Sequence, residues 1–238
     1  MNKKAINTDL GNIGYEEALK EQYDYQQKLI RRKLNIRDGK QTAEHEELIH
    51  NLFFCEHKPV YTLGKSGSFD NLLLNEEQLA GRGIEFHKSS RGGDITYHGP
   101  GQLVGYPVFD LDEFYHDVHK FVRDIEEVII LSLKEYDIDS VRIPGLTGVW
   151  IKGEGKAKDR KICAIGIHIS RWVTLHGFAL NVNTDLDYFS GIIPCGIEDQ
   201  NKDVTSIEKE LGKKVDFEDV KKNVKQKFKE VFDLNFCK

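Results

Sequence analysis

Residues 91–111, RGGDITYHGPGQLVGYPVFDL, carry the strongest information about the fold of this chain. Paired glycines allow backbone amides to come close to a ligand, because no Cβ stands in the way. Arg91 and His98 are candidate polar contacts at the edge of such a pocket. The same residues also fit a hairpin with a glycine-proline turn, in which His98 only satisfies a hydrogen bond in the core. The glycine content leaves both interpretations open.

The glycine spacing within this stretch does not match the common nucleotide-binding motifs. It is neither G-x-G-x-x-G nor a phosphate loop that ends in Gly-Lys-Ser/Thr. The sequence therefore gives little support to the binding of nucleotide phosphates.

Strands are predicted within this stretch and on both sides of it. Residues 102–111 form a near-continuous apolar run, which is typical of a buried strand. Residues 94–98 form a shorter strand pattern, and the charged segment 152–160 is expected to connect two strands as a hairpin. Further strand patterns cover residues 48–57, 60–64, 84–89, 141–143, 147–151, 161–170 and 172–182.

Helical patterns alternate with these strands along the chain. The clearest amphipathic helix is expected over 117–136, and others over 14–34, over 75–83 with Asn75 as N-cap, and from about Asp216. Thr205 and Glu208 resemble a capping box for a short helix that ends near residue 211. This order predicts an α+β (mixed α/β) class. Because no linker interrupts the 238 residues, we expect one domain over 1–238.

Composition and charge exclude several classes of protein. The net charge of −5 argues against nucleic acid as the main partner. No apolar run is long enough to span a membrane, and the first residues do not resemble a signal or transit peptide, so a cytoplasmic location is expected. The four cysteines are far apart, which disfavours a disulfide scaffold and a zinc knuckle. The histidines show no ligand spacing, so no metal site is expected.

Cys195 is a candidate nucleophile because of its local sequence. It lies between Pro194 and Gly196 in IIPCGIEDQNKDVTSI, residues 192–207, rather than inside an apolar run. A thiol in such a turn can be partly exposed, with backbone amides beside it that hold a thiolate or an oxyanion. An incidental loop cysteine explains the same residues equally well.

Lys161 opens the apolar strand KICAIGI, residues 161–167. Side chains alternate along a strand, so Lys161 and Cys163 are expected on the same face. A partly desolvated lysine there would favour a neighbouring thiolate or act as a base. The residues alone favour the simpler interpretation, a surface lysine that ends a charged loop, because Lys158 and Arg160 precede it.

Together these segments resemble the octanoyl-[acyl carrier protein]:protein octanoyltransferases, also called lipoyl(octanoyl) transferases. The resemblance rests on 91–111 and on three further segments: EHKPVYTLGKSG (56–67), GVWIKGEGKAKDRKICAIGIHISRWVTLHGFALNVNTDL (148–186) and IIPCGIED (192–199). It implies the biotin/lipoate protein ligase-like fold, a mixed sheet with flanking helices and a smaller sheet.

The resemblance also implies the roles of individual residues. Cys195 would carry the acyl group as a thioester, and Lys161 would lower the pKa of that thiol. Lys158 is a possible replacement for Lys161, and Cys163 a second thiol near the site. The implied substrate contacts share glycine-rich or small-residue surroundings: Arg91, Gly92, Gly93, Asp94, Ile95, Thr96, Tyr97, His98, Ala164, Ile165, Gly166, Gly177, Phe178 and Ala179.

The implied reaction moves an octanoyl group, or a lipoyl group, from acyl carrier protein to a lysine. The acceptors would be apo lipoyl domains of 2-oxoacid dehydrogenase E2 subunits and the glycine-cleavage H protein. Such a ping-pong transfer requires no cofactor, ATP or metal, and a monomer is expected. A free cysteine has a pKa of about 8.5, so speed near neutral pH requires a charged neighbour.

Two other functions are compatible with this fold. An ATP-dependent lipoate or biotin ligase would need ATP and would not depend on a cysteine. A non-catalytic module that binds acyl groups or carriers would keep its function after Cys195→Ser. A related amidotransferase, which moves octanoyl between two carrier proteins, would differ only in its acceptor.

Overall fold

The computed structural model describes residues 3–39, 49–155, 157–194 and 202–237. The helices are α1 (Tyr15–Arg37), α2 (Glu76–Gly81), α3 (Val118–Lys134), α4 (Ile207–Leu211) and α5 (Phe217–Phe232). The strands are β1 (Lys3–Ile13), β2 (His50–His57), β3 (Val60–Leu63), β4 (Glu85–Lys88), β5 (Ile95–His98), β6 (Gln102–Val108), β7 (Val149–Ile151), β8 (Asp159–Ser170), β9 (Val173–Asn181), β10 (Lys202–Val204) and β11 (Leu234–Phe236). Short 3-10 turns include η3 (Leu186–Gly191).

The described residues form one large mixed sheet and one small sheet. The large sheet has the order β10-β8-β9-β6-β2-β1-β11, and β7 also pairs with β8. Its centre is antiparallel from β8 to β2, while β1, β11 and β10 join their neighbours in parallel. The small sheet has the order β4-β3-β5.

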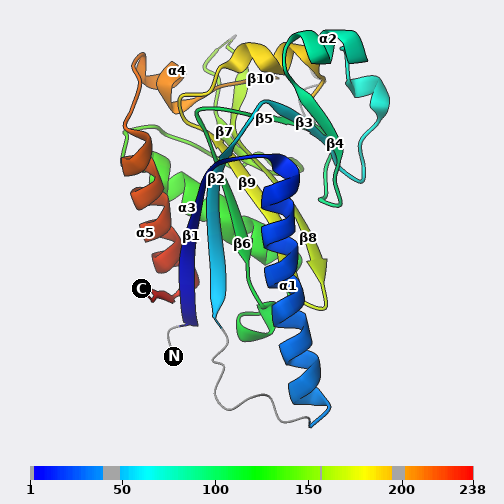
Figure 1. Ribbon diagram of the computed structural model, residues 1–238. Coiled ribbons are helices and arrows are strands. Elements are labelled where there is room, and N and C mark those ends of the chain that lie inside the picture. Colours follow the sequence, from blue (N-terminus) through cyan, green and yellow to red (C-terminus); the bar gives the residue numbers. More distant parts are fainter. Residues whose placement is uncertain (1–2, 40–48, 156, 195–201, 238) are drawn as a thin grey trace.

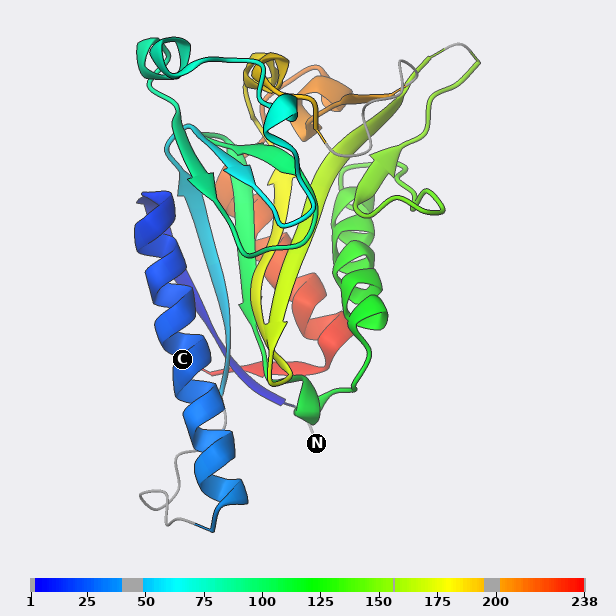
Figure 2. The same cartoon turned by 90° about the vertical axis from the view of Figure 1, so that its right-hand side faces the viewer.

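Helices cover both faces of the large sheet (Figures 1 and 2). Helix α1 packs on one face, against a core cluster that includes Phe53, Val104 and Ala179. Helices α3 and α5 pack on the other face and contact each other. Each helix buries one stripe; in α3 this stripe includes Phe121, Ile125 and Ile129, at the spacing that the sequence predicts. The sheet is therefore the middle layer of three.

The small sheet lies at one end of the large sheet, beside α2 (Figure 2). Its own core contains Tyr61, Ile95 and Tyr97, which pack against residues of η3. The segment between β4 and β5 returns from this sheet to the edge of β8, where the Gly92 amide donates to the Ile167 carbonyl at 3.0 Å. This contact brings the glycine block of 91–93 onto the large sheet.

Most of the predicted elements are confirmed with small shifts in their ends. The expected helix over 75–83 is α2, and Asn75 and Gln78 form the predicted capping box. The helix expected from Asp216 is α5, with Asp216 as its N-cap. The long strands expected over 102–111, 161–170 and 172–182 correspond to β6, β8 and β9. The charged segment after β7 connects it to an antiparallel β8, as predicted.

Three expectations about local structure are wrong or incomplete. The cap of α4 is Ser206, whose side chain accepts from the Lys209 amide, while the Thr205 hydroxyl donates to Glu210. Residues 141–143 form no strand of their own; Val141 makes only an isolated bridge to Trp150. The strands β1, β10 and β11 were not predicted.

Among the described residues, no helix is both long and apolar enough to cross a membrane.

Gly177→Ala is expected to destabilise the fold. An added Cβ at this position would lie 2.0 Å from the Gly105 carbonyl oxygen, a backbone atom that cannot move without disturbing the sheet. Overpacking of this kind costs about 1–3 kcal/mol. Urea unfolding should show this loss, whereas Gly81→Ala, which meets no atom within 4 Å, should not lower stability. Equal stability of the Gly177→Ala variant and the parent would contradict the packing at the centre of the sheet.

Candidate active site at the edge of β8

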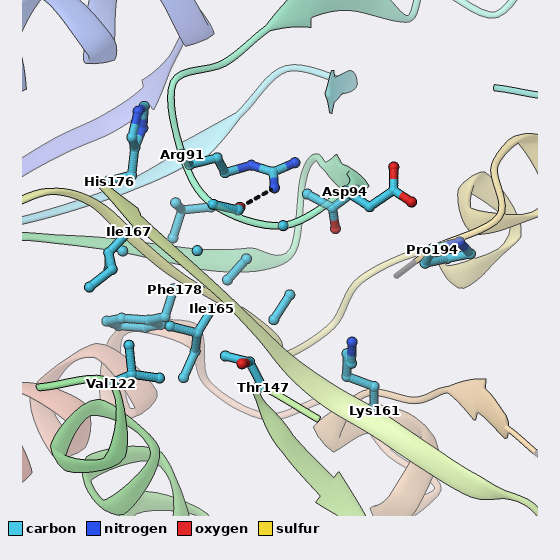
Figure 3. A pocket seen from close by; sticks show the side chains of 18 of the residues that line it. Arg91, Asp94, Val122, Thr147, Lys161, Ile165, Ile167, His176, Phe178 and Pro194 are labelled. Atoms are coloured by element: carbon cyan, nitrogen blue, oxygen red, sulfur yellow. Dashed lines mark hydrogen bonds between the residues drawn. The ribbon is translucent and has the colours of Figure 1, made fainter. Parts of the chain in front are cut away.

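A cavity of about 410 Å³ surrounds the exposed edge of β8. Much of its wall comes from the loop that leads into β5, the strands β8 and β9, the first turns of α3, and the segment before β7. Residues of α1, β6, η3 and β10, together with Pro194, complete it. Figure 3 shows Arg91 and His176 on one side of the β8 ribbon, and Val122, Ile165 and Phe178 on the other. Lys161 and Pro194 both lie toward the right of this view, with Asp94 beside Pro194.

Strand pairing explains why the cavity has two different faces. Ala164 pairs with Ala179 and Gly166 with Gly177, so these four small residues lie toward the glycine block. Ile165 pairs with Phe178 between them, and both side chains point to the opposite face, toward α3 and α5. We call the first face the glycine-side recess (Gly92, Gly93, Ala164, Gly166, Gly177 and Ala179). The second face, with Val118, Val122, Leu146, Thr147, Ile165 and Phe178, is the helix-side recess.

The glycine block lies too close to β8 for larger residues. A Cβ on Gly166 would lie 2.8 Å from the Gly92 carbonyl oxygen, and a Cβ on Gly64 would lie 2.3 Å from the Gly93 carbonyl oxygen. Gly93 itself has φ +85°, a conformation that other residues rarely adopt. These contacts explain why glycine is needed at these positions, and they leave only a narrow space under the loop.

The two charged residues of the glycine block hold its shape. Arg91 is 8% exposed, and its guanidinium donates to the hydroxyl of Thr62 at 2.9 Å, to the carbonyl of Thr62 and to that of Gly92. The Asp94 carboxylate accepts from the Asn71 amide and from the Ile95 backbone. Both side chains therefore tie the loop to β3 and η1 (Phe69–Asn71) while lining the cavity.

Buried histidines flank the glycine-side recess, each with a neutral hydrogen-bond partner. His98 contacts the Gln102 side chain at 2.8 Å, His176 contacts Ser90 at 2.9 Å, and His57 contacts the Tyr106 hydroxyl at 2.7 Å. Burial lowers the pKa of all three; it falls to about 4 for His57 and about 3 for His176. His98 thus makes the core hydrogen bond of the simpler interpretation, and it also lines the cavity.

Lys161, near the start of β8, also lines the cavity. Its Nζ lies 4.6 Å from the centre of the fully buried Trp150 ring, close enough for a cation–π interaction. Its backbone carbonyl accepts from the Thr205 amide at 3.0 Å. This part of β8 is thus fixed by β7, by β10 and by the start of α4.

The expected shared face of Lys161 and Cys163 does not give a second thiol in the cavity. The register between β7 and β8 shifts here, so that Val149 faces Cys163 but Trp150 faces Lys161. Such a bulge interrupts regular alternation. Cys163 is fully buried in the core on the α3 side, where burial raises the pKa of its thiol. Lys161 lines the cavity and Cys163 does not.

Of the fourteen predicted contact residues, all within the described part of the chain, only Tyr97 is absent from the cavity wall. Its ring stacks on Tyr188 at 4.8 Å in the core of the small sheet. The predicted nucleophile Cys195 lies outside the described residues, while Pro194, to which it is bonded, lines the cavity. Lys158 is exposed, and it does not line the cavity.

Sequence reasoning missed several residues of the wall. Tyr15, Val118, Val122 and the segment that carries Leu146 and Thr147 have no motif. His176 lies within the resemblance segment 148–186 but was not among the predicted contacts. The wall before β7 depends on Glu126, which is 0% exposed and accepts from the Gly148 amide at 3.0 Å, from Arg123 at 2.6 Å and from Arg142 at 3.1 Å. Glu126, a charged residue among the apolar positions of α3, was the one signal in the sequence that could have indicated this contact.

Within the described ranges, no cluster of three or more His, Cys, Asp or Glu side chains could hold a metal ion. The expectation that the protein uses neither a metal nor a cofactor remains a prediction.

Comparison with known proteins adds to this geometry. The family model for the lipoyl protein ligase A/B catalytic domain matches residues 9–229. The chain belongs to this lipoyl protein ligase A/B family. It is 52% identical to an octanoyltransferase of Flavobacterium psychrophilum, over 98% of each chain. It is 51% identical to one of Cytophaga hutchinsonii, over 98% of this chain and 95% of that one.

Solved structures of lipoyl and biotin ligases share the fold. A bi-partite lipoate protein ligase from Thermoplasma acidophilum aligns with a TM-score of 0.70 at 19% identity, over 99% of this chain and 86% of that one. A biotin protein ligase from Aquifex aeolicus aligns with a TM-score of 0.51 at 15% identity, over 97% and 71%. The predicted mixed sheet with flanking helices and a smaller sheet is confirmed.

The buried histidines predict loss of stability in mild acid. Burial lowers the pKa to about 3 for His50 and His176 and to about 4 for His57, against about 6.5 in the unfolded chain. Below pH 6.5 the unfolded chain binds protons that the folded chain does not, so the free energy of unfolding should fall. The slope is up to about 1.4 kcal/mol per pH unit for each histidine. Urea unfolding at pH 7 and pH 5 measures it, and equal values would contradict the neutral, buried state of these rings.

Proposed function

We propose that this member of the lipoyl protein ligase A/B family is an octanoyltransferase that works through a thioester on Cys195. The observation that carries the proposal is the position of the cavity. Lys161 and Pro194 both line the cavity that contains the glycine-side recess, and Cys195 is the next residue in the chain. The names of the curated relatives support the same reaction.

In the first step the Cys195 thiolate attacks the carbonyl of an octanoyl thioester on acyl carrier protein. A carbon–sulfur bond forms to Cys195, the bond to the carrier sulfur breaks, and the carrier thiolate takes up a proton. Backbone amides of the glycine block and of the turn around Cys195 are proposed to stabilise the oxyanion. The octanoyl chain occupies the glycine-side recess.

In the second step the ε-amine of an acceptor lysine attacks the acyl-enzyme. An amide forms, the Cys195 sulfur leaves, and the proton released by the amine restores the thiol. Because a thioester is converted to an amide, this step is downhill and needs no ATP. Apo lipoyl domains of 2-oxoacid dehydrogenase E2 subunits and the glycine-cleavage H protein are the proposed acceptors.

Lys161 is proposed to make Cys195 reactive. A nearby ammonium favours the thiolate and lowers the pKa of the thiol. The Trp150 ring beneath Nζ holds the ammonium in the wall of the cavity. The same ammonium can protonate the departing carrier thiolate.

An ATP-dependent ligase remains the second candidate, because the fold is shared with lipoate and biotin ligases. The identity of about half the residues with octanoyltransferases favours the transferase. A monomeric state and a cytoplasmic location stay predictions.

The direct test is intact mass spectrometry after mixing the protein with octanoyl acyl carrier protein in the absence of ATP. We expect one hydroxylamine-labile octanoyl group on the parent and none on Cys195→Ser, because the thioester forms on that sulfur. Addition of an apo lipoyl domain should remove the group from the parent and transfer it to the domain. An adduct on the variant, or transfer only with ATP, would contradict the proposal.

The same assay separates the two candidate lysines. Lys161→Ala should keep the fold and slow adduct formation by roughly 100-fold or more, the range expected for loss of an acid–base group. Lys158→Ala is the matched control and should react at the normal rate. Normal acylation of a folded Lys161→Ala variant would remove Lys161 from the mechanism.

A further inference from the structure

The helix-side recess has no role in the proposed path of the acyl chain. It belongs to the same cavity as the glycine-side recess, but its apolar lining faces α3 on the other side of β8. Val122, Leu146, Ile165 and Phe178 form its floor and walls. Figure 3 shows Val122, Thr147, Ile165 and Phe178 grouped below the β8 ribbon, on the side away from Arg91.

The two recesses differ in how they end. The glycine-side recess is covered, because the Gly92 amide bonds to Ile167 and the Gly92 carbonyl lies over Gly166. The helix-side recess opens outward between α3 and the segment before β7, where Val118 is 39% exposed and Thr147 is also exposed. A covered recess suits a chain that ends in a methyl group. An open one suits a chain that continues to a large molecule outside.

The edge of β8 adds polar groups to the apolar helix-side recess. The Ile167 carbonyl points away from β9, since it accepts from the Gly92 amide. Ile165 is two residues away in the same strand, so its backbone amide and carbonyl point outward as well. They lie between the segment of β8 that pairs with β7 and the contact with Gly92. A ligand with amides along its chain can pair with this edge.

A thioester donor has two substituents at its reacting bond, the acyl chain and the thiol arm. Both must reach the reacting group, and residues of the two recesses line one cavity together with Lys161 and Pro194. From this arrangement we propose that the helix-side recess binds the thiol arm of the donor, a pantetheine-type chain of apolar segments and amides. The inference rests on the proposed function and names the subsite for the leaving group.

The wall of this recess is held by a buried charge rather than by a strand. Glu126 binds the Gly148 amide and two arginines, and so fixes the segment that carries Leu146 and Thr147. Arg123 also lines the recess and is about half exposed, with its guanidinium 2.6 Å from Glu126. His119, one turn before it on α3, lines the outer part.

The test fills the recess and compares two donors with the same acyl group. Val122→Trp places an indole in the recess from α3, and Thr147→Trp does so from the exposed segment before β7. The donors are S-octanoyl-pantetheine, which has the long arm, and S-octanoyl-2-mercaptoethanol, which does not. The rate of Cys195 acylation is followed by mass spectrometry for each donor. Val141→Trp is the matched control, because Val141 is exposed and lies outside the cavity wall.

Both recess variants should lower kcat/KM for the pantetheine donor by roughly tenfold or more, the size expected for one blocked pocket contact. The short donor should change by no more than about twofold, since its arm ends before the recess. Thermal melting checks that each variant is folded. If Val122→Trp does not fold, Thr147→Trp provides the test.

Four results would overturn the inference. Equal losses for both donors would mean that the substitution disturbs the reacting centre. Unchanged rates for both would mean that the recess is not used. A loss confined to the second step, measured with preformed acyl-enzyme and an apo lipoyl domain, would assign the recess to the acceptor. If octanoyl acyl carrier protein acylates the parent but S-octanoyl-pantetheine reacts no faster than the short donor, the inference has failed while the proposed function stands. If octanoyl acyl carrier protein itself gives no acyl-enzyme, the proposed function has failed.

Discussion

The close approach of the glycine block to the edge of β8 determines the shape of the site. One hydrogen bond, from the Gly92 amide to the Ile167 carbonyl at 3.0 Å, joins a loop of the small sheet to the large sheet. The contact is possible only because Gly166 has no side chain beneath the Gly92 carbonyl. Arg91 holds the loop from inside through Thr62. The loop therefore covers one face of β8, and Lys161 and Pro194 line the same cavity.

Simple strand alternation then gives the site two faces with different chemistry. Small residues of β8 and β9 point toward the loop, and Ile165 and Phe178 point toward α3. Lys161 lies where both faces can be reached, over the ring of Trp150. A transferase that holds an acyl chain and a leaving thiol at once can use one face for each. His98 and His176, whose pKa values are lowered by burial, also line the cavity.

The sequence predicted the parts of the fold that have strong local signals. The apolar runs of β6, β8 and β9, the amphipathic α3 and the Asn75 cap all follow from periodicity and side-chain chemistry. Strand β1 was missed because KKAINTDLGNI is largely polar and only Ala5 of it is buried. The cap of α4 moved by one residue because Thr205 instead bonds Glu210.

The site shows the same division between local and tertiary signals. The family resemblance located the glycine block, and the structure brings most of the predicted contact residues to one cavity. Tyr97 turns into the small sheet, and the bulge in β8 separates Lys161 from Cys163, neither of which a local pattern can show. The helix-side recess depends on Glu126 and Gly148, which are distant in sequence and meet only in the folded chain.

We place the acyl chain on the glycine-side face of β8, beside the contact between Gly92 and Gly166. A crystal structure of the octanoyl-enzyme, formed from a thioester donor without acceptor, can locate the chain. We expect electron density that runs from Cys195 along Ala164 and Ala179 toward His98. Density on the other face of β8, against Val122 and Phe178, would contradict it.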